Sequence, residues 1–288
     1  MTETLLTVAA PELFGTGPLL GGLARVEELR SLGFTALELW CPWQVDETNA
    51  TEVRTALDGL GMTVACVSSP SYLHGETTGA GRRLIGTSIA IAAELGAARV
   101  NTYFGHGGTG DDRAAAAAYA RLVAPLLRQA DAAGVTIVME NEFDAFGHDP
   151  EHYDISRRAA SLRHLVELVD HPRFRLNFDA ANFACAGEDV AEAAALLASY
   201  TGYVHVKDVV TVTDGQDGGA TDGNTYTDGD TTYRTVPLGT GEVPWTEVLG
   251  RLAEAGYDGP FTLEPHCRPS ALHAQLTASR AFLMEHIG

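Results

Sequence analysis

Short runs of β-branched and aromatic residues alternate with amphipathic stretches along the chain. Eight runs have strand character, at residues 5–9, 35–39, 63–67, 98–104, 135–140, 174–179, 203–207 and 260–264. Between and after them lie stretches whose apolar residues recur with helical spacing, near 21–32, 49–60, 80–95, 112–133, 156–169, 188–199, 244–255 and 268–286. Strands that alternate with helices in this way predict a parallel sheet.

The number of units and the chain length favour one architecture. Eight strand–helix units in 288 residues match a closed (β/α)8 barrel, a TIM barrel, which we expect as a single domain over residues 1–288. Helix-stopping glycines end several of the helical stretches, namely Gly33, Gly61, Gly96, Gly134 and Gly256. An open doubly wound sheet is the alternative, but no glycine-rich dinucleotide loop follows the first strand.

One segment interrupts the alternation. Residues 208–236 are rich in Gly, Asp and Thr and carry no periodic apolar face. They predict a long loop after the seventh strand, and because loops of this length are commonly functional we interpret it as a lid. Its acids lack the spacing of a calcium loop that ends in a bidentate Glu.

The charge balance limits the classes of partner. Nineteen basic against 38 acidic residues give a net charge of −19, which would repel a nucleic-acid backbone or an anionic membrane. No apolar stretch approaches the ~20 residues of a membrane helix, and the N-terminus has no signal-peptide pattern. The four cysteines are far apart in the sequence and form no CxxC pair, which indicates reduced thiols. We therefore expect a soluble cytoplasmic protein without a nucleic-acid or membrane partner.

Four consecutive strands, the fifth to the eighth, carry side chains near their ends that can bind a metal: Glu140, Asp179, His205 and Glu264. In such barrels the C-terminal ends of the strands carry the chemistry. The two-residue period of a strand places all four side chains toward the barrel interior. The apolar residues next to them should face the helices instead: Met139, Phe178, Val206 and Leu263.

Three carboxylates that converge in a half-buried barrel mouth repel one another, and their pKa values rise. A divalent cation removes that repulsion. A donor set of oxygens with one imidazole suits Mn, Mg or Co better than Zn. The alternative is that each acid is an ordinary polar residue at a strand end, which explains one acid better than a set at matching positions. We therefore predict one divalent metal ion.

The second half of the chain resembles the xylose-isomerase-like barrel family of sugar-phosphate isomerases and epimerases. The resemblance is carried by MEN at 139–141, FDAAN at 178–182, HVKD at 205–208, PLGTGEVPW at 237–245 and GYDGPFTLEPH at 256–266. The first half is similar mainly in its rhythm of strands and helices. The resemblance implies that a single metal ion is held by Glu140, Asp179, His205 and Glu264. It also implies that two of these ligands, Glu140 and Glu264, are the catalytic proton carriers.

Two positions near the predicted ligands leave alternatives open. Asn182 stands where the epimerases of the family have a His, and Glu142 could replace Glu140 as a ligand. Lys207 is the only lysine of the chain, and we expect it to contact a substrate oxygen or Asp208. The full set of substrate-binding candidates is Trp40, His74, His106, Glu142, Asn182, Lys207 and Arg268. The PLGTGEV turn is expected to close on the substrate or on the metal ligands.

The predicted chemistry is proton transfer next to a carbonyl. A metal bound to a carbonyl and a neighbouring hydroxyl acidifies the C–H between them, and one carboxylate removes the proton while another returns it. We therefore predict a metal-dependent isomerase or epimerase of a small sugar, keto-sugar or polyol. A small carbohydrate is the expected partner, and self-association into a homo-oligomer stays open.

Three other functions are alternatives. The first is a lyase on the same scaffold, either an inosose-type dehydratase or an eliminative sugar glycoside lyase. The second is an apurinic endonuclease, which needs further histidines, whereas residues 206–263 contain none and the net charge opposes DNA binding. The third is a non-catalytic sugar-binding barrel, against which the four-ligand set argues.

Overall fold

The computed structural model describes residues 6–9, 17–73, 78–105, 111–143, 154–212, 223–228 and 231–287. Eight parallel strands close into a barrel: β1 (Leu6–Ala9), β2 (Ala36–Trp40), β3 (Thr63–Tyr72), β4 (Arg99–Tyr103), β5 (Thr136–Glu140), β6 (Phe174–Asp179), β7 (Thr201–Val206) and β11 (Phe261–Leu263). Strand β11 pairs with both β7 and β1, so the barrel has no free edge. The predicted TIM barrel is confirmed, and the open doubly wound alternative is wrong.

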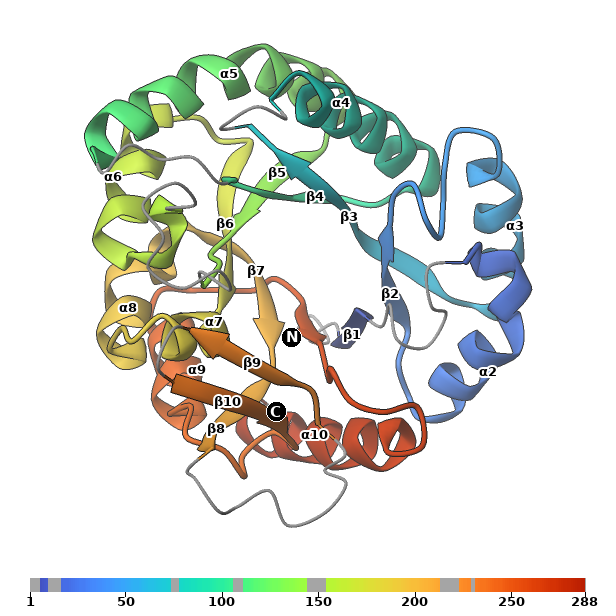
Figure 1. Ribbon diagram of the computed structural model, residues 1–288. Helices are drawn as coiled ribbons and strands as arrows, with labels where there is room; N and C mark the ends of the chain where they lie inside the picture. Colours follow the sequence, from blue (N-terminus) through green and yellow to red (C-terminus); the bar gives the residue numbers. More distant parts are fainter. Residues whose placement is uncertain are drawn as a thin grey trace.

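Helices form an outer ring around the barrel (Figure 1). They are α2 (Leu23–Ser31), α3 (Ala50–Leu60), α4 (Thr78–Leu95), α5 (Asp112–Ala133), α6 (Ala159–Val169), α8 (Val190–Leu197), α9 (Trp245–Glu254) and α10 (Leu272–Ile287). The described residues also include the 3-10 helices η1 (Leu19–Gly22), η3 (Ile155–Arg157) and η4 (Ala198–Tyr200), and a short α7 (Ala180–Cys185) that was not predicted. Within the described ranges, no helix is both long and apolar enough to cross a bilayer.

Capping residues in the sequence define where the helices begin and end. The Asp111 carboxylate accepts hydrogen bonds from the N–H groups of Arg113 and Ala114, and so opens α5. Gly134 ends the same helix with a φ of +71°, a left-handed conformation that favours glycine. Strand β5 can therefore begin two residues later, at Thr136.

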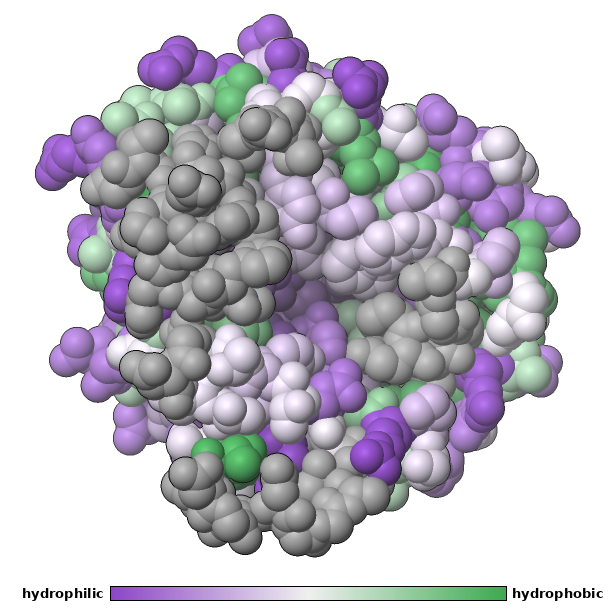
Figure 2. Space-filling view, viewed as in Figure 1, coloured by the Kyte–Doolittle hydropathy of each residue, from purple (hydrophilic) through white to green (hydrophobic). Residues whose placement is uncertain are grey.

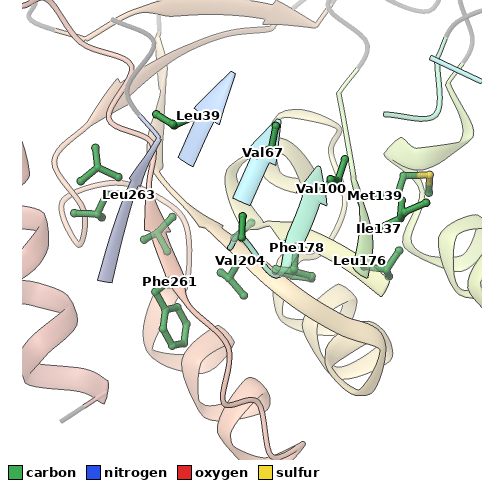
Figure 3. Packing of buried hydrophobic residues seen from close by; sticks show 14 of the residues in the cluster. Leu39, Val67, Val100, Ile137, Met139, Leu176, Phe178, Val204, Phe261 and Leu263 are labelled. Atoms are coloured by element: carbon green, nitrogen blue, oxygen red, sulfur yellow. The ribbon is translucent and has the colours of Figure 1, made fainter. Parts of the chain in front are cut away.

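The two faces of the barrel strands pack into different environments. Apolar side chains fill the layer between barrel and helices (Figure 3), and this layer includes the four residues predicted to face the helices: Met139, Phe178, Val206 and Leu263. A smaller cluster of buried residues comprises Ala36, Ala65, Cys66, Val138 and Tyr203. Because Val138 and Tyr203 share their strand faces with Glu140 and His205, this second cluster is the apolar floor of the barrel interior.

A three-stranded antiparallel sheet follows β7. It consists of β8 (Asp208–Val212), β10 (Thr231–Val236) and β9 (Thr225–Asp228), in that spatial order, and it lies to one side of the barrel opening (Figure 1). The sequence predicted a loop here, because this segment has no alternating apolar face. Thr, Val and Tyr nevertheless favour extended backbone, and the strands pair from Asp208 with Val236 to Thr232 with Val212.

The Gly-rich turn that follows the sheet closes on a carboxylate. Asp208 Oδ2 accepts hydrogen bonds from the N–H groups of Gly239 and Gly241, at 2.9 and 3.0 Å. Its Oδ1 accepts from Val243 and Val209, at 3.1 and 3.0 Å. A Cβ at Gly241 would lie 2.1 Å from Asp208 Oδ1, so only glycine allows this approach. The observed partner of the turn is therefore Asp208, whereas the expected partners were substrate or metal ligands.

Candidate metal centre and active site

Four side chains that end adjacent barrel strands meet at the C-terminal mouth. Glu140 comes from β5, Asp179 from β6, His205 from β7, and Glu264 directly follows β11. One potential ligand atom of each lies within 4.8 Å of the others, and none of the four residues is more than 5% exposed. The space-filling view shows hydrophilic residues at the bottom of a hollow at this end of the barrel (Figure 2). The structure thus brings together the four residues that the sequence singled out.

The imidazole of His205 is held between two acids. Its Nδ1 lies 3.0 Å from Glu140 Oε1, and its Nε2 lies 2.9 Å from Oε2 of Glu38. Glu38 lies in β2, two residues before the strand ends, and also accepts a hydrogen bond of 2.6 Å from Ser68. Burial alone would lower the pKa of His205, but the carboxylates of Glu140, Glu38 and Glu264 outweigh it and hold this pKa well above its usual range.

The orientation of the Glu140 carboxylate is fixed by two amide side chains. Asn101 Nδ2 donates a 2.7 Å hydrogen bond to Glu140 Oε2, and Asn177 Nδ2 donates to the same oxygen at 3.2 Å. Asn177 also donates to Asn101 Oδ1. Because Oε2 is occupied by these donors, Oε1 is the oxygen that faces His205 and the ligand cluster.

Asp179 is fixed through the start of α7. Its Oδ1 accepts a 2.9 Å hydrogen bond from the N–H of Asn182, while Asn141 exchanges two 2.8 Å hydrogen bonds with the Asp179 backbone. Asn182 Nδ2 in turn donates to the carbonyl of Asn141. Asp179 Oδ2 lies 2.8 Å from Lys207 Nζ, but the angles do not suit a hydrogen bond. Burial raises the pKa of Asp179, and Lys207 offsets only part of that rise.

Lys207 joins two of the acids of the cluster. Its Nζ lies between Asp179 Oδ2, at 2.8 Å, and Glu264 Oε2, at 2.9 Å. The prediction that Lys207 contacts Asp208 is wrong, because the Asp208 carboxylate accepts hydrogen bonds from the backbone of the Gly-rich turn instead. Burial alone would lower the pKa of Lys207, but Asp179 and Glu264 outweigh it and hold the pKa well above its usual range.

Each oxygen of Glu264 has a side-chain nitrogen beside it. His266 Nε2 lies 3.1 Å from Oε1, and Lys207 Nζ donates to Oε2. Burial would raise the pKa of Glu264, but Lys207, His266 and His205 together hold it well below its usual range. Asp179, at 2.8 Å from Lys207, has a raised pKa instead, because burial and the carboxylates of Glu140 and Glu264 outweigh Lys207 and His205.

Aromatic rings line one side of the mouth. Trp40, at the end of β2, stacks on Trp43 with ring centroids 5.4 Å apart, and on Tyr103 at 6.3 Å. Tyr103 in turn packs against Tyr72 at 5.9 Å. The half-buried Glu142 interacts electrostatically with both tyrosines, and burial together with Glu140 raises the pKa of Glu142 well above its usual range.

The remaining predicted positions divide into two groups. His74 and His106 lie outside the described residues, and Arg268 is exposed beyond β11. Sequence reasoning missed Asn101 and His266 as parts of the site, whereas Glu38 was an inner-face candidate near the end of the second strand, with packing and a hydrogen bond as the alternative. The signal for Glu38 is that an acid on the inner face near the end of β2 matches the pattern of the later strands.

The donor set fits a divalent cation. Three carboxylates and one imidazole supply oxygen-rich ligation with a single nitrogen. The buried Asp179 Oδ2 accepts no hydrogen bond of suitable angle and so retains a lone pair for a cation. His205 Nε2 bonds to the Glu38 carboxylate, which is the support that metal-binding imidazoles ordinarily have, and this leaves Nδ1 toward the cluster.

Three comparisons place the chain among known proteins. A model of the xylose isomerase-like TIM barrel family matches residues 26–286. A protein of Streptomyces coelicolor named "Putative hydroxypyruvate isomerase" is 27% identical over 272 aligned residues, and the match covers 86% of this chain and 88% of the relative. A solved structure of L-ribulose 3-epimerase is 19% identical with a TM-score of 0.75, over 99% of this chain and 95% of that one.

A xylose isomerase-like TIM barrel protein from Mycobacterium smegmatis, solved in complex with magnesium, is likewise 19% identical. It has a TM-score of 0.74, over 99% of this chain and 97% of that one. At these identities the two solved structures compare the fold alone.

Proposed function

This chain belongs to the xylose isomerase-like TIM barrel family, and on that premise we propose that it is a divalent-metal-dependent isomerase or epimerase of a small sugar, keto-sugar or polyol. One observation carries the proposal: three carboxylates and one imidazole from four neighbouring strands converge within 4.8 Å in a buried mouth. A barrel that only binds sugar has no need for such a set, because carboxylates that converge in a buried site are costly even when they are paired.

In this proposal one divalent ion, with Mn, Mg or Co preferred to Zn, is held by four ligands: Glu140, Asp179, His205 and Glu264. When bound, the ion polarises a substrate carbonyl and acidifies the neighbouring C–H. Glu38 keeps the His205 ring oriented, and Asn101 keeps Glu140 Oε1 turned toward the cluster. Lys207 supplies positive charge where the acids are closest.

Glu140 and Glu264 are the proposed proton carriers. They stand at the two ends of the row of four neighbouring strands, so a substrate in the mouth has one carboxylate on each side. One carboxylate removes the proton from the substrate carbon, and the other returns a proton. The proton returns to the opposite face of the substrate for inversion and to the same face for isomerisation.

The substrate is proposed to lie against the aromatic side of the mouth. Trp40 offers a flat apolar face beside the acids, and Glu142, Asn182 and Lys207 offer polar contacts to hydroxyl groups. His74, His106 and Arg268 are proposed as further substrate contacts.

The test is proton exchange in D2O, followed by NMR, with Mn²⁺-loaded protein and a panel of ketoses and inososes that includes L-ribulose and hydroxypyruvate. Deuterium at a carbon next to the carbonyl, with an isomerised or epimerised product, is the expected result. An unsaturated product would assign the lyase alternative. A panel that shows neither exchange nor product would contradict the proposal.

Two variants assign the proton carriers. Glu140→Gln and Glu264→Gln each keep a ligand oxygen but remove the base, so each should lose about 10²–10⁴-fold in rate. Glu167→Gln is the matched control, because Glu167 is exposed on α6 and pairs with Arg163. A Gln variant that keeps its metal and the wild-type rate would show that its Glu is a ligand only.

A further inference from the structure

The carboxylate of Glu264 is held from a second side by a residue that sequence analysis did not single out. We propose that His266 is a positioning residue, which fixes Glu264 opposite Lys207, and that the inserted sheet β8–β10–β9 holds His266 in place for this task. The inference rests on the proposed function only where it treats Glu264 as a reacting group. Its structural part stands on the contacts of His266 itself.

The contact between the two side chains is direct. His266 Nε2 lies 3.1 Å from Glu264 Oε1, while Lys207 Nζ lies 2.9 Å from Glu264 Oε2. With a nitrogen at each oxygen, the carboxylate cannot rotate without losing at least one of these bonds. Glu264 is 5% exposed, so water has little access to replace a lost partner.

The backbone of His266 adopts a conformation that its residue type disfavours. Its φ is +40°, in the left-handed region. The other described non-glycine residue with a positive φ is Asp170, which ends α6 as a left-handed helix cap. His266 ends no helix, and a strained backbone that surrounding contacts enforce is typical of functional sites.

The contacts that enforce this conformation come from the inserted sheet. The His266 carbonyl accepts hydrogen bonds from Thr235 Oγ1 at 2.6 Å and from the N–H of Asn224 at 2.9 Å. Gly223 forms a β-bridge with Cys267, the next residue. The Tyr226 ring packs edge-on against the imidazole, with centroids 5.9 Å apart.

The backbone at Gly223 lies too close to Thr235 for any residue other than glycine at position 223. A Cβ at Gly223 would lie 1.9 Å from the carbonyl oxygen of Thr235, so the chain just before β9 can approach β10 this closely only with glycine there. Thr235 is 2% exposed, and its hydroxyl also accepts from the Asn224 N–H. The sheet therefore reaches Glu264 through His266, from Thr235 by way of the His266 backbone and from Tyr226 by way of the imidazole ring.

The experiment compares two substitutions at one position. His266→Phe keeps the ring against Tyr226 and removes the nitrogen, whereas His266→Gln places a side-chain amide where Nε2 stands. Supporting hydrogen bonds of this kind are commonly worth about 10–100-fold in metal affinity or activity. We expect His266→Phe to weaken Mn²⁺ binding, measured by calorimetry on the full chain, and to lower kcat by that factor with little change in KM. His266→Gln should recover most of both losses.

A second pair of variants tests the support from the sheet without touching His266. Thr235→Val keeps the branched shape and removes the hydroxyl, and Thr235→Ser keeps the hydroxyl. Thr235→Val should shift Mn²⁺ affinity and kcat in the same direction as His266→Phe, and Thr235→Ser should not. Circular dichroism checks that each variant is folded.

Two outcomes would overturn the inference. One is a folded His266→Phe protein with wild-type Mn²⁺ affinity and kcat. The other is an equal loss in the Phe and Gln variants, which would mean that the nitrogen is not what matters. The Mn²⁺ comparison does not need a substrate, so it decides the role of His266 even if no panel compound shows proton exchange and the proposed function fails.

Discussion

Removing the charge of Glu38 should weaken metal binding although Glu38 is not among the four proposed ligands. Glu38 holds His205 Nε2 at 2.9 Å and is 2% exposed, so the Glu38→Gln change acts on a buried, charge-assisted hydrogen bond. A glutamine oxygen can still accept from Nε2, but without the charge. The His205 ring should therefore keep its place while its Nδ1 becomes a poorer ligand.

The size of the effect follows from the kind of bond that changes. A hydrogen bond to a charged group is worth about 1.5–3 kcal/mol and a neutral one about 0.5–1.5 kcal/mol, so the substitution removes about 1–1.5 kcal/mol. Since 1.4 kcal/mol corresponds to a factor of ten, Mn²⁺ affinity should fall about tenfold. Glu38→Ala leaves both His205 and Ser68 without this acceptor and should cost about 100-fold, the upper end for such supporting residues.

Calorimetric titration of metal-free protein with Mn²⁺ measures the affinity directly. Ser68→Ala is the matched control, because it removes the other partner of Glu38 and leaves the bond to His205 intact. The control should stay within about threefold of the wild type, as a bond one step further from the ion. If Glu38→Gln binds Mn²⁺ as tightly as the wild type, His205 is not a ligand or Glu38 does not support it.

Two further substitutions test the polar contacts around the cluster. Asp208→Asn replaces an acceptor oxygen that two backbone N–H groups share. Because two hydrogen bonds to a charged group are weakened, the free energy of unfolding should fall by about 3 kcal/mol. Urea unfolding that shows no loss of stability would contradict the role given to this carboxylate. Lys207→Met leaves Asp179 and Glu264 without their ammonium, so the metal-free protein should lose about 3–5 kcal/mol. In thermal unfolding, this loss of stability should be smaller when Mn²⁺ is present. An equal loss with and without Mn²⁺ would refute the idea that Lys207 and the ion neutralise the same carboxylates.

The sequence was sufficient to predict the barrel and the polar residues at the C-terminal ends of its later strands. The repeated alternation of strand and helix predicted the closed sheet, and the two-residue period predicted that Glu140 and His205 share the inner side with Val138 and Tyr203. Both patterns are local, so they can be read without knowing which distant residues meet.

What the sequence could not show depends on contacts between distant segments. Glu38 and His205 are 167 positions apart, and their pairing arises only because the closed barrel brings the end of β2 across from β7. The sheet at 208–236 escaped prediction because its strands lack one consistently apolar face. The role proposed for His266 depends on its backbone φ and on the hydrogen bonds to its carbonyl, and neither can be predicted from the residue type.

The inserted sheet leaves and rejoins the barrel at a single place, since Asp208 pairs with Val236. A segment whose two ends are neighbours can be lengthened, shortened or replaced at little entropic cost, without altering the path of the barrel strands. The four proposed metal ligands belong to the barrel, whereas Tyr226 and Thr235 belong to this exchangeable segment. Such a division would let relatives diversify the support of one acid, and with it the substrates they accept, while the ligand cluster stays the same. Grafting the segment between related barrels is then a direct way to ask which part of the molecule sets the choice of sugar.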